Sequence, residues 1–355
     1  MGYVIFLVAI LIFQQIFANY YYKNALKGVK VKRYFTKNRL FEGDTLEVVY
    51  EIENHKRLPL FNLMVIDYLP DNLKTISGNK YRNLNSFHIT IWGYKKVIRR
   101  YKMVAAARDY VSVSSIHLRI HDVFGILESE QEFKSYDNIY IYPRPKQLKL
   151  RAESETIKEA RSVKKWIEED PLSFYSVRKY TSTDPFKKIN WKKTAQLGEL
   201  MVNEYEANKS KKVSIYVNLK GSNFNFLGIN AAHLEDLLRY TAYLARYFVE
   251  HGYELSVFAN SGIKTDERRY VRVEPGMGRK HLNVIYEMFS LVDYHMVHDD
   301  DMIIRQNRHI LSDGKVIVVS MPQVGWGENV VKTLKRYGID ALFIGVSADE
   351  KAQFV

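Results

Sequence analysis

The longest apolar stretch of the chain lies at its N-terminus. Residues 1–22 carry no charged side chain, although Gln14 and Gln15 interrupt the apolar run, and Tyr20–Tyr22 follow it. About 20 mostly apolar residues cross the hydrocarbon core of a bilayer as a helix, and tyrosine is enriched at the membrane interface. The pattern predicts a transmembrane helix over residues 1–22. Two alternatives are a buried soluble helix and a cleaved signal peptide, but the basic n-region of a signal peptide is missing.

Residues 29–146 show the two-residue period of half-buried β-strands. Between Leu46 and Ile52, every second residue is apolar, and Glu47 and Glu51 stand between them. Similar short runs recur up to Pro145, and a change of phase near Ser114–Ser115 indicates a β-bulge. Several short strands with little helical pattern predict an all-β, immunoglobulin-like sandwich over residues 29–146.

The pattern changes twice more along the chain. Residues 147–206 are basic and only partly periodic, which predicts a basic motif and linker region. Residues 207–355 alternate between strand-like and helical patterns, with a strong amphipathic helix at Ala231–His251 and a continuous apolar strand at Lys315–Val319. This alternation predicts an α/β, Rossmann-like domain with a parallel sheet and helices on both faces.

The charge distribution predicts on which side of the membrane the domains lie. The chain has a net charge of +13 and no cysteine, which excludes disulfides, a thiolate nucleophile and cysteine-ligated zinc. Seven basic residues precede the first acidic one, Glu42; they are Lys23, Lys27, Lys30, Lys32, Arg33, Lys37 and Arg39. The positive-inside rule therefore predicts a single-pass cell-membrane protein with cytoplasmic C-terminal domains. The same block is attracted to anionic membrane lipid.

A search for catalytic chemistry finds no recognised motif. The chain lacks a phosphate-binding loop, a nucleophile elbow and a zinc-binding helix of the known patterns. His295, His298 and Asp299–Asp301 form a ligand-rich cluster that could hold a metal, but a solvated loop after the preceding helix is the favoured interpretation. The sequence therefore predicts a protein that is not an enzyme and needs no cofactor.

A dense charged motif lies in the linker region. Between Arg178 and Ala195, basic residues far outnumber acidic ones, and tyrosine, phenylalanine and tryptophan are interleaved with them. Such a segment suits nucleic acid, through stacking and phosphate contacts, or an acidic protein partner. It also suits an amphipathic helix that packs Ile189, Trp191 and Ala195 onto the next domain.

At this motif the chain resembles the prokaryotic "domain of unknown function 58" family. The family pattern is matched, in register, by Arg178, Tyr180, Asp184, Ile189, Trp191, Lys192 and Ala195, followed by Glu199-Leu200 and Val202-Asn203-Glu204. Asp122–Ile126 and Ile139–Pro143 also resemble that family. The chain departs from the pattern where Thr183 replaces a glycine, Lys187 an arginine and Asn190 an aspartate.

The resemblance implies a fold for the C-terminal region and a function. That region of the family is similar to a von Willebrand factor type A domain, which can carry an Asp-x-Ser-x-Ser metal site. The corresponding positions are Asn218, Lys220 and Ser222, and we expect no metal there because the carboxylate is missing and a lysine is present. The implied function is a non-enzymatic, membrane-anchored scaffold or chaperone-associated protein that works with a MoxR-type AAA+ ATPase.

The same motif supplies the candidate partner-binding residues, which are Arg178, Tyr180, Asp184, Lys187, Lys188, Trp191, Lys192 and Glu204. We expect Trp191 and Tyr180 to pack inward, because burying an aromatic ring stabilises a fold more than burying most side chains. Arg178 and Asp184 are close enough in sequence to form an ion pair across a turn. A membrane-tethered nucleic-acid-binding protein is the alternative function, although the other features favour a protein partner.

Overall fold

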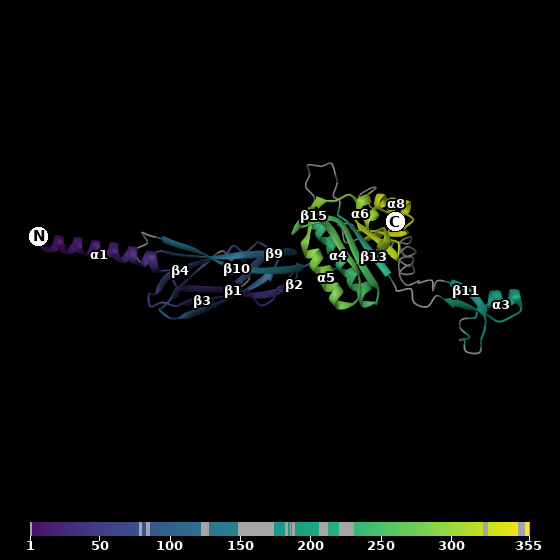
Figure 1. Cartoon of the computed structure of the whole chain (residues 1–355), viewed down its shortest axis with the longest axis horizontal. Helices are drawn as coiled ribbons and strands as arrows, with labels where there is room; N and C mark the ends of the chain where they lie inside the picture. The colour runs from purple at the N-terminus through teal and green to yellow at the C-terminus, as the bar shows by residue number, and fades with distance from the viewer. Residues whose placement is uncertain are drawn as a thin grey trace. The chain divides into compact units, whose positions relative to one another are not determined.

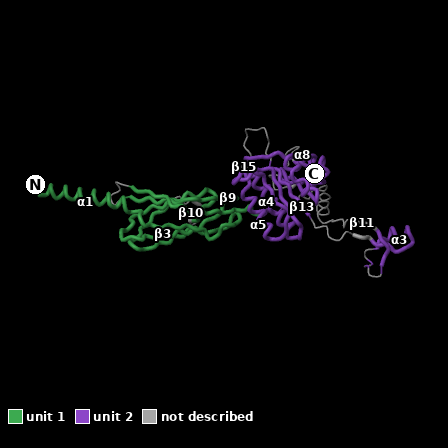
Figure 2. Tube along the Cα trace, in the orientation of Figure 1, with its two compact units in different colours: residues 1–144 green, residues 145–355 purple. Residues whose placement is uncertain are grey.

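The chain consists of two compact units, residues 1–144 and residues 145–355 (Figure 2). The structure, a computed structural model, describes residues 2–77, 80–82, 86–121, 128–147, 174–181, 184, 186, 189–205, 212–219, 231–321, 326–346 and 352–354. Of the motifs considered above, Asp122–Ile126, Thr183, Lys187, Lys188, Lys220 and Ser222 lie outside the described residues.

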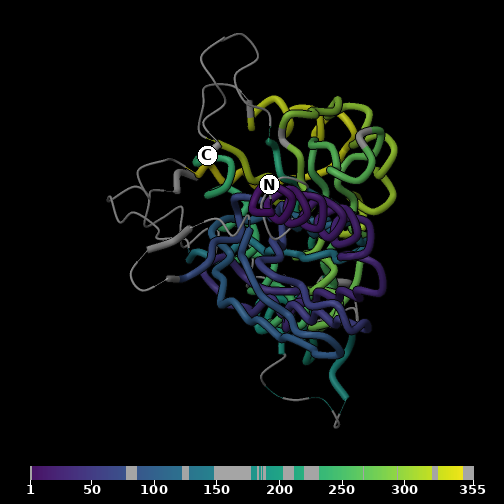
Figure 3. The backbone as a smooth tube through the Cα atoms, turned by 90° about the vertical axis from the view of Figure 1, so that its left-hand side faces the viewer, coloured from purple at the N-terminus to yellow at the C-terminus, as the bar shows by residue number. Residues whose placement is uncertain are grey.

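The first unit begins with helix α1 (Gly2–Asn24), whose N-terminus points away from the strands (Figure 1, Figure 3). Within the described part of the chain, α1 is the one helix that is long and apolar enough to span a membrane. The predicted apolar helix is therefore confirmed. Ala18 and Tyr21 near the end of α1 are buried, and Tyr21 joins the core of the unit together with Ala25 and Leu26, which follow the helix.

The remainder of the first unit is two five-stranded sheets. The first sheet contains, in order, β1 (Val29–Phe35), β3 (Thr45–Asn54), β8 (Lys96–Ala105), β5 (Leu73–Ser77) and β6 (Lys80–Arg82). The second contains β2 (Arg39–Phe41), β10 (Glu128–Tyr142), β9 (Asp109–His121), β4 (Leu60–Ile66) and β7 (Ser86–Ile91). All neighbours are antiparallel except β2 and β10. Both sheets contribute to one hydrophobic core, which makes the unit a β-sandwich.

The alternation in the sequence explains which side chains enter this core. In β3, Leu46, Val48, Tyr50 and Ile52 are buried, since successive residues of a strand face opposite sides of the sheet. The predicted bulge has its extra residue in the partner strand. The β9–β10 register shifts between Lys134 and Asp137, opposite Ser115 and Val113.

A buried arginine fastens this bulge to the neighbouring sheet. Arg33 of β1 donates hydrogen bonds to Asp67 Oδ1 at 2.7 Å, to Asp137 Oδ2 at 3.0 Å and to the carbonyl of Ser135 at 2.7 Å. Tyr50 donates a 2.6 Å hydrogen bond to the other Asp67 oxygen. Buried charges are stable only when they are paired in this way.

The second unit contains a seven-stranded sheet with four parallel central strands, β14 (Glu254–Ile263), β13 (Lys212–Asn218), β17 (Lys315–Ser320) and β18 (Ala341–Val346). The predicted parallel sheet is present at the centre, but the edges of the sheet are antiparallel. There β15 (Asp266–Gly276), β16 (Val292–Val297) and β19 (Ala352–Phe354) pair antiparallel to their neighbours. A two-residue turn joins β14 directly to β15, so no crossover helix can form between them.

Helices cover this sheet as the alternation predicts (Figure 1). Tyr216, Phe258, Val316 and Val318 lie on one face and pack against α6 (Asp300–Gln306), α7 (Arg308–Leu311) and α8 (Trp326–Arg336). The helices α4 (Ala231–Glu250) and α5 (Gly278–Leu291) pack together, and α4 contacts β13, β14 and β17.

Part of the predicted linker region is folded. Strands β11 (Phe174–Lys179) and β12 (Met201–Tyr205) pair antiparallel, and the short helix α3 (Trp191–Leu197) lies between them in sequence. We call the described residues from Phe174 to Tyr205 the motif unit. It contains most of the residues that carry the family resemblance.

Candidate functional site

An ion pair organises the start of the motif unit. The guanidinium of Arg178 donates two hydrogen bonds of 2.7 Å, one to each carboxylate oxygen of Asp184. The backbone amide of Thr181 donates to Asp184 at 2.9 Å and its hydroxyl at 2.7 Å. The predicted pairing across a turn is therefore confirmed. The bonds from Arg178, followed by those from Thr181, hold the pKa of Asp184 far below its ordinary value.

Two capping interactions define α3. Asn190 is the N-cap, and its side-chain oxygen accepts a 3.0 Å hydrogen bond from the amide of Lys193. Gly198 ends the helix with φ of 70°, and its amide donates to Thr194 at 2.9 Å. Asparagine and aspartate are comparable N-caps. The replacement of the family aspartate by Asn190 therefore preserves the helix start.

The prediction that Trp191 packs inward is wrong. Trp191 is the first residue of α3 and is 65% exposed. The inward position belongs to its neighbour Ile189, which is 6% exposed and forms a β-bridge with Val202 of β12. Tyr180 is half-buried and its ring packs against Phe186, with ring centroids 5.7 Å apart.

The outer surface of the motif unit combines apolar and basic side chains. The exposed apolar residues are Phe186, Trp191, Leu197 and Leu200. Lys192 and Lys193 are also exposed and follow Trp191 in the first turn of α3. Glu204 lies in β12 opposite Ser176. The structure thus brings together Arg178 with Asp184, whereas Lys192 faces outward on its own helix.

Asn218, the one described residue among the three positions that correspond to a metal site, lies at the carboxyl end of the parallel sheet. Asn218 ends β13 and is buried, and its side-chain oxygen accepts a 2.7 Å hydrogen bond from Asn260 of β14. Asn260 also accepts from the amide of Leu219 at 2.7 Å and donates to Asp300 at 3.0 Å. Tyr216 donates to the same Asp300 oxygen at 2.5 Å. This edge is thus a network of amides around one carboxylate.

Sequence patterns did not single out Tyr216 or Asn260, and they placed Asp300 in the His295–Asp301 cluster rather than beside these two residues. A polar residue at the carboxyl end of the buried strand Leu255–Ala259 was the available signal for Asn260. Burial and the nearby charge of Asp300 hold the pKa of Tyr216 well above its ordinary value. The tyrosine therefore stays protonated and acts as a hydrogen-bond donor.

The solvated-loop interpretation of the His295–Asp301 cluster is also wrong. His295 lies in β16, and Asp299 is the N-cap of α6, where it accepts a 3.1 Å hydrogen bond from the amide of Met302. Asp301 accepts from the hydroxyl of Tyr337. These carboxylates serve the fold. In the described ranges, no three histidine, aspartate or glutamate side chains converge as metal ligands.

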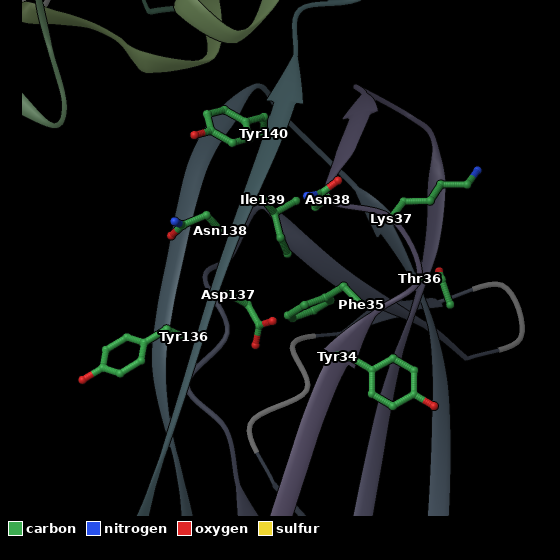
Figure 4. A pocket seen from close by; sticks show the side chains of 10 residues that line it. All are labelled: Tyr34, Phe35, Thr36, Lys37, Asn38, Tyr136, Asp137, Asn138, Ile139 and Tyr140. Atoms are coloured by element: carbon green, nitrogen blue, oxygen red, sulfur yellow. The ribbon is translucent and has the colours of Figure 1, made fainter.

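The sandwich contains a pocket that the sequence did not predict (Figure 4). It has a volume of about 490 Å³ and is lined by residues 34–38, which are the end of β1 and the segment after it, and by residues 136–140 of β10. Figure 4 shows Phe35 and Asp137 facing each other between these two segments. Asp137 is held there by Arg33. The pocket wall is therefore part of the same buried-arginine network.

A comparison with family models matches residues 176–295 to "Protein of unknown function DUF58". This match covers the motif unit from Ser176, the region that carries the resemblance noted above. Among curated proteins, the uncharacterized protein YeaD of Bacillus subtilis (strain 168) is 24% identical over 191 residues. That alignment covers 53% of this chain and 47% of YeaD, so the chain spans about half the length of this relative.

The similarity between the chain and solved structures is weak. Spo0M, a sporulation control protein from Bacillus subtilis, matches 43% of this chain and 58% of its own at 11% identity and a TM-score of 0.18. The PapD-like domain 7 of human CEP192 matches 32% of this chain and 86% of its own, at 9% identity and a TM-score of 0.20. A non-cellulosomal cohesin from the archaeon Archaeoglobus fulgidus matches 30% of this chain and 90% of its own, at 16% identity and a TM-score of 0.19. These scores assign neither a fold family nor a function.

Proposed function

Because residues 176–295 of this chain belong to the DUF58 family of proteins of unknown function, we propose that it is a membrane-anchored, non-enzymatic scaffold. Its motif unit binds a protein partner, and α1 holds the chain in the cell membrane. The seven basic residues that precede Glu42 favour a cytoplasmic location for everything after α1.

The observation that carries the proposal is the exposed apolar surface of the motif unit. Trp191, Leu197 and Leu200 are large apolar side chains that remain exposed on a small two-stranded unit. Exposed apolar groups with a polar rim mark interaction sites, and tryptophan is enriched among the residues that dominate binding energy. This surface therefore suits a protein interface.

The motif unit also presents this surface in a fixed conformation. The Arg178–Asp184 pair closes the turn before Ile189, while Asn190 and Gly198 cap the two ends of α3. Such pre-organisation reduces the conformational entropy that is lost on binding. The family motif residues therefore act mainly by positioning Trp191 and Lys192.

Charge indicates the class of partner. Lys192 and Lys193 are exposed beside Trp191, and the whole chain carries +13. A basic surface associates fastest with an acidic one. We propose an acidic surface of a MoxR-type AAA+ ATPase as that partner, since the family resemblance implies such an ATPase.

We propose finer fold assignments on the same basis. The two-sheet sandwich is taken as immunoglobulin-like, and the α/β part of the second unit as von Willebrand factor A-like. In support of the latter, β13 lies between β14 and β17, so the order of the parallel strands reverses at Asn218. This is where open α/β sheets place ligands.

Binding between purified proteins tests the function. The full chain in lipid nanodiscs is titrated with the MoxR-type ATPase from the same organism, and the dissociation constant is measured for wild type, Trp191→Ala/Leu197→Ala and a control. The control is Tyr136→Ala, which removes an exposed aromatic ring from the sandwich. We expect at least about tenfold weaker binding for the double variant alone, or roughly 1.4 kcal/mol. Equal binding by all three proteins contradicts the proposal.

One outcome would favour the nucleic-acid alternative. An exposed tryptophan beside two lysines also provides stacking and phosphate contacts for single strands. Submicromolar binding of a single-stranded oligonucleotide at physiological salt, lost in Lys192→Gln/Lys193→Gln and weakening steeply with added salt, would replace the protein-partner proposal.

A further inference from the structure

We infer that the end of the sandwich next to α1 is itself a lipid-binding surface, which inserts Phe61, Trp92 and Tyr94 into the head-group region of an anionic membrane. This inference rests on the proposed membrane anchoring by α1. It adds to that anchoring a second contact, made by two loops that are distant from α1 in the sequence.

The first observation is that α1 is packed against the sandwich at its last turn. The hydroxyl of Tyr21 donates a 3.1 Å hydrogen bond to the carbonyl of Pro59 and accepts a 3.0 Å hydrogen bond from the amide of Phe61. Tyr21 itself is 1% exposed. The start of β4, which contains Phe61, therefore lies at the level of Tyr20–Tyr22, where the apolar helix meets the membrane interface.

The second observation is that the loop at residues 92–95 contacts both the loop at residues 55–59 and the start of β4. The rings of Phe61 and Trp92 meet edge to face, with centroids 5.7 Å apart. The amide of Tyr94 donates to the carbonyl of Lys56 at 3.1 Å. A Cβ atom on Gly93 would lie only 2.3 Å from the carbonyl oxygen of Arg57, so the two loops touch where glycine leaves room.

The same end of the sandwich exposes aromatic rings in a conformation that the fold maintains against strain. Phe61, Trp92 and Tyr94 are all exposed, as are Tyr20 and Tyr22 of α1. Tyr94 has φ of 56°, in the left-handed region that bulky residues avoid. Strained backbone persists where the surrounding structure holds it, often at functional sites. Here it directs an aromatic ring into the solvent next to Trp92.

Basic residues accompany these rings. Lys23, Lys27, Arg57 and Lys95 are exposed, and Lys56 is half-buried. Glu53, near the end of β3, is already paired with His55 at 3.0 Å and with Lys96 at 3.3 Å. Aromatic rings at head-group depth with surrounding lysine and arginine are typical of surfaces that bind anionic lipid. A protein partner is less compatible, because α1 already places this end against the bilayer.

The physical consequence is a sandwich with a fixed orientation on the membrane. The packed helix end and the inserted loops are separate contacts on one rigid unit, and together they prevent rotation about α1. We call Phe61, Trp92, Tyr94, Lys56, Arg57 and Lys95 the membrane-proximal rim.

Spin labels on the full chain test the rim, because the chain has no cysteine and single substitutions label cleanly. Labels are placed at Tyr94→Cys in the rim, at Leu11→Cys in α1 and at Tyr136→Cys by the pocket, in vesicles of phosphatidylcholine with phosphatidylserine. Depth is measured from the relative access of oxygen and a water-soluble nickel complex. We expect a hydrocarbon position for Leu11, an interfacial position for Tyr94 and an aqueous position for Tyr136.

The outcomes separate the rim from the anchor. An aqueous Tyr94 label together with a buried Leu11 label overturns the rim and leaves the anchoring intact. An aqueous Leu11 label overturns the anchoring on which the inference rests.

A second measurement uses the native tryptophan of the rim as the probe in place of a spin label. Trp92 is the sole tryptophan of residues 1–144, so its emission is the difference between wild type and Trp92→Phe. Brominated lipids should quench that difference signal. The quenching should be reduced in Lys56→Gln/Arg57→Gln/Lys95→Gln when phosphatidylserine is present, and less so in phosphatidylcholine alone. Absence of quenching at Trp92 contradicts the inference.

Discussion

The two units of the chain each contain an arginine–aspartate pair, and the two pairs stabilise very different things. Arg33 and Asp67 are 0% and 2% exposed, and Arg33 also reaches Asp137, 104 residues away in sequence. Arg178 and Asp184 are 41% and 12% exposed and six residues apart. The first pair joins the two sheets of a sandwich, whereas the second closes one turn. Similar ion pairs therefore differ in importance according to burial and sequence separation.

Breaking the buried pair should have the largest effect. Arg33→Met leaves Asp67 as an uncompensated buried charge, and we expect the sandwich to lose about 3–5 kcal/mol of unfolding free energy. Urea unfolding followed by the difference in emission between each protein and its Trp92→Phe counterpart measures this unit, since the other three tryptophans lie in the second unit. The double variant Arg33→Met/Asp67→Asn removes the charge and should recover much of the loss. Equal losses in both variants would show that the charge is not the cause.

For Asp300, a carboxylate that is only partly buried, we expect a loss of stability smaller than that at Arg33. Tyr216→Phe removes the hydroxyl that donates to Asp300 at 2.5 Å and leaves this partly buried carboxylate with one donor fewer. We expect a cost of about 1–3 kcal/mol. Thermal unfolding of the second unit, monitored by hydrogen exchange in β13 and β14, measures it. Tyr337→Phe, which removes the longer hydrogen bond to Asp301, is the matched control and should cost less.

Acid should release the exposed pair with a predictable sign. The hydrogen bonds from Arg178 and Thr181 hold the pKa of Asp184 below its unfolded value, near 3.9 for aspartate. The stabilisation is therefore fully present above that unfolded value and is lost as the pH falls through the lower, folded pKa. The amide resonance of Thr181, which donates to Asp184, should report this titration well below pH 4 by NMR. A midpoint at the ordinary aspartate value would mean that the pair does not form in solution.

The smallest effect on stability is expected at Trp191. Its ring is exposed, so Trp191→Ala should change the free energy of unfolding by less than about 0.5 kcal/mol. Ile189→Ala, at the buried neighbouring position, should cost about 2–5 kcal/mol of the local stability of the motif unit. Proteolysis of the motif unit distinguishes the two variants. A large loss at Trp191 would show that a further surface covers the ring.

The parts of the fold that follow a simple period could be predicted from the sequence. The apolar run at residues 1–22 predicts α1, and the alternation around Tyr50 predicts β3 because each pattern matches the repeat of its element. The family resemblance also holds, since it depends on residues in register rather than on packing. What these patterns cannot show is the pairing of strands that lie far apart in sequence.

The errors have specific physical causes. Trp191 was expected inside because burying an aromatic ring stabilises a fold strongly, but α3 starts after Asn190, and the buried position is that of Ile189. Asp299–Asp301 resemble a solvated acidic loop, yet an N-cap and first turn favour the same acidic residues. The antiparallel edge strands β15 and β16 have the same apolar runs as parallel ones, and only their connections distinguish them.

The bulge in β10 has a consequence for how copies of this chain meet. Among the described residues, β2 pairs only with Tyr140–Tyr142 of β10. On that side of the sheet, β10 therefore has no paired β2 residue before Tyr140. An open strand edge is a template for pairing with another chain. Under the proposed anchoring by α1, copies in one membrane would diffuse in two dimensions with their edges at the same height, which would make such encounters frequent. Arg33 binds the carbonyl of Ser135 and holds the irregular geometry there, so the edge cannot serve as a straight template for a neighbouring copy.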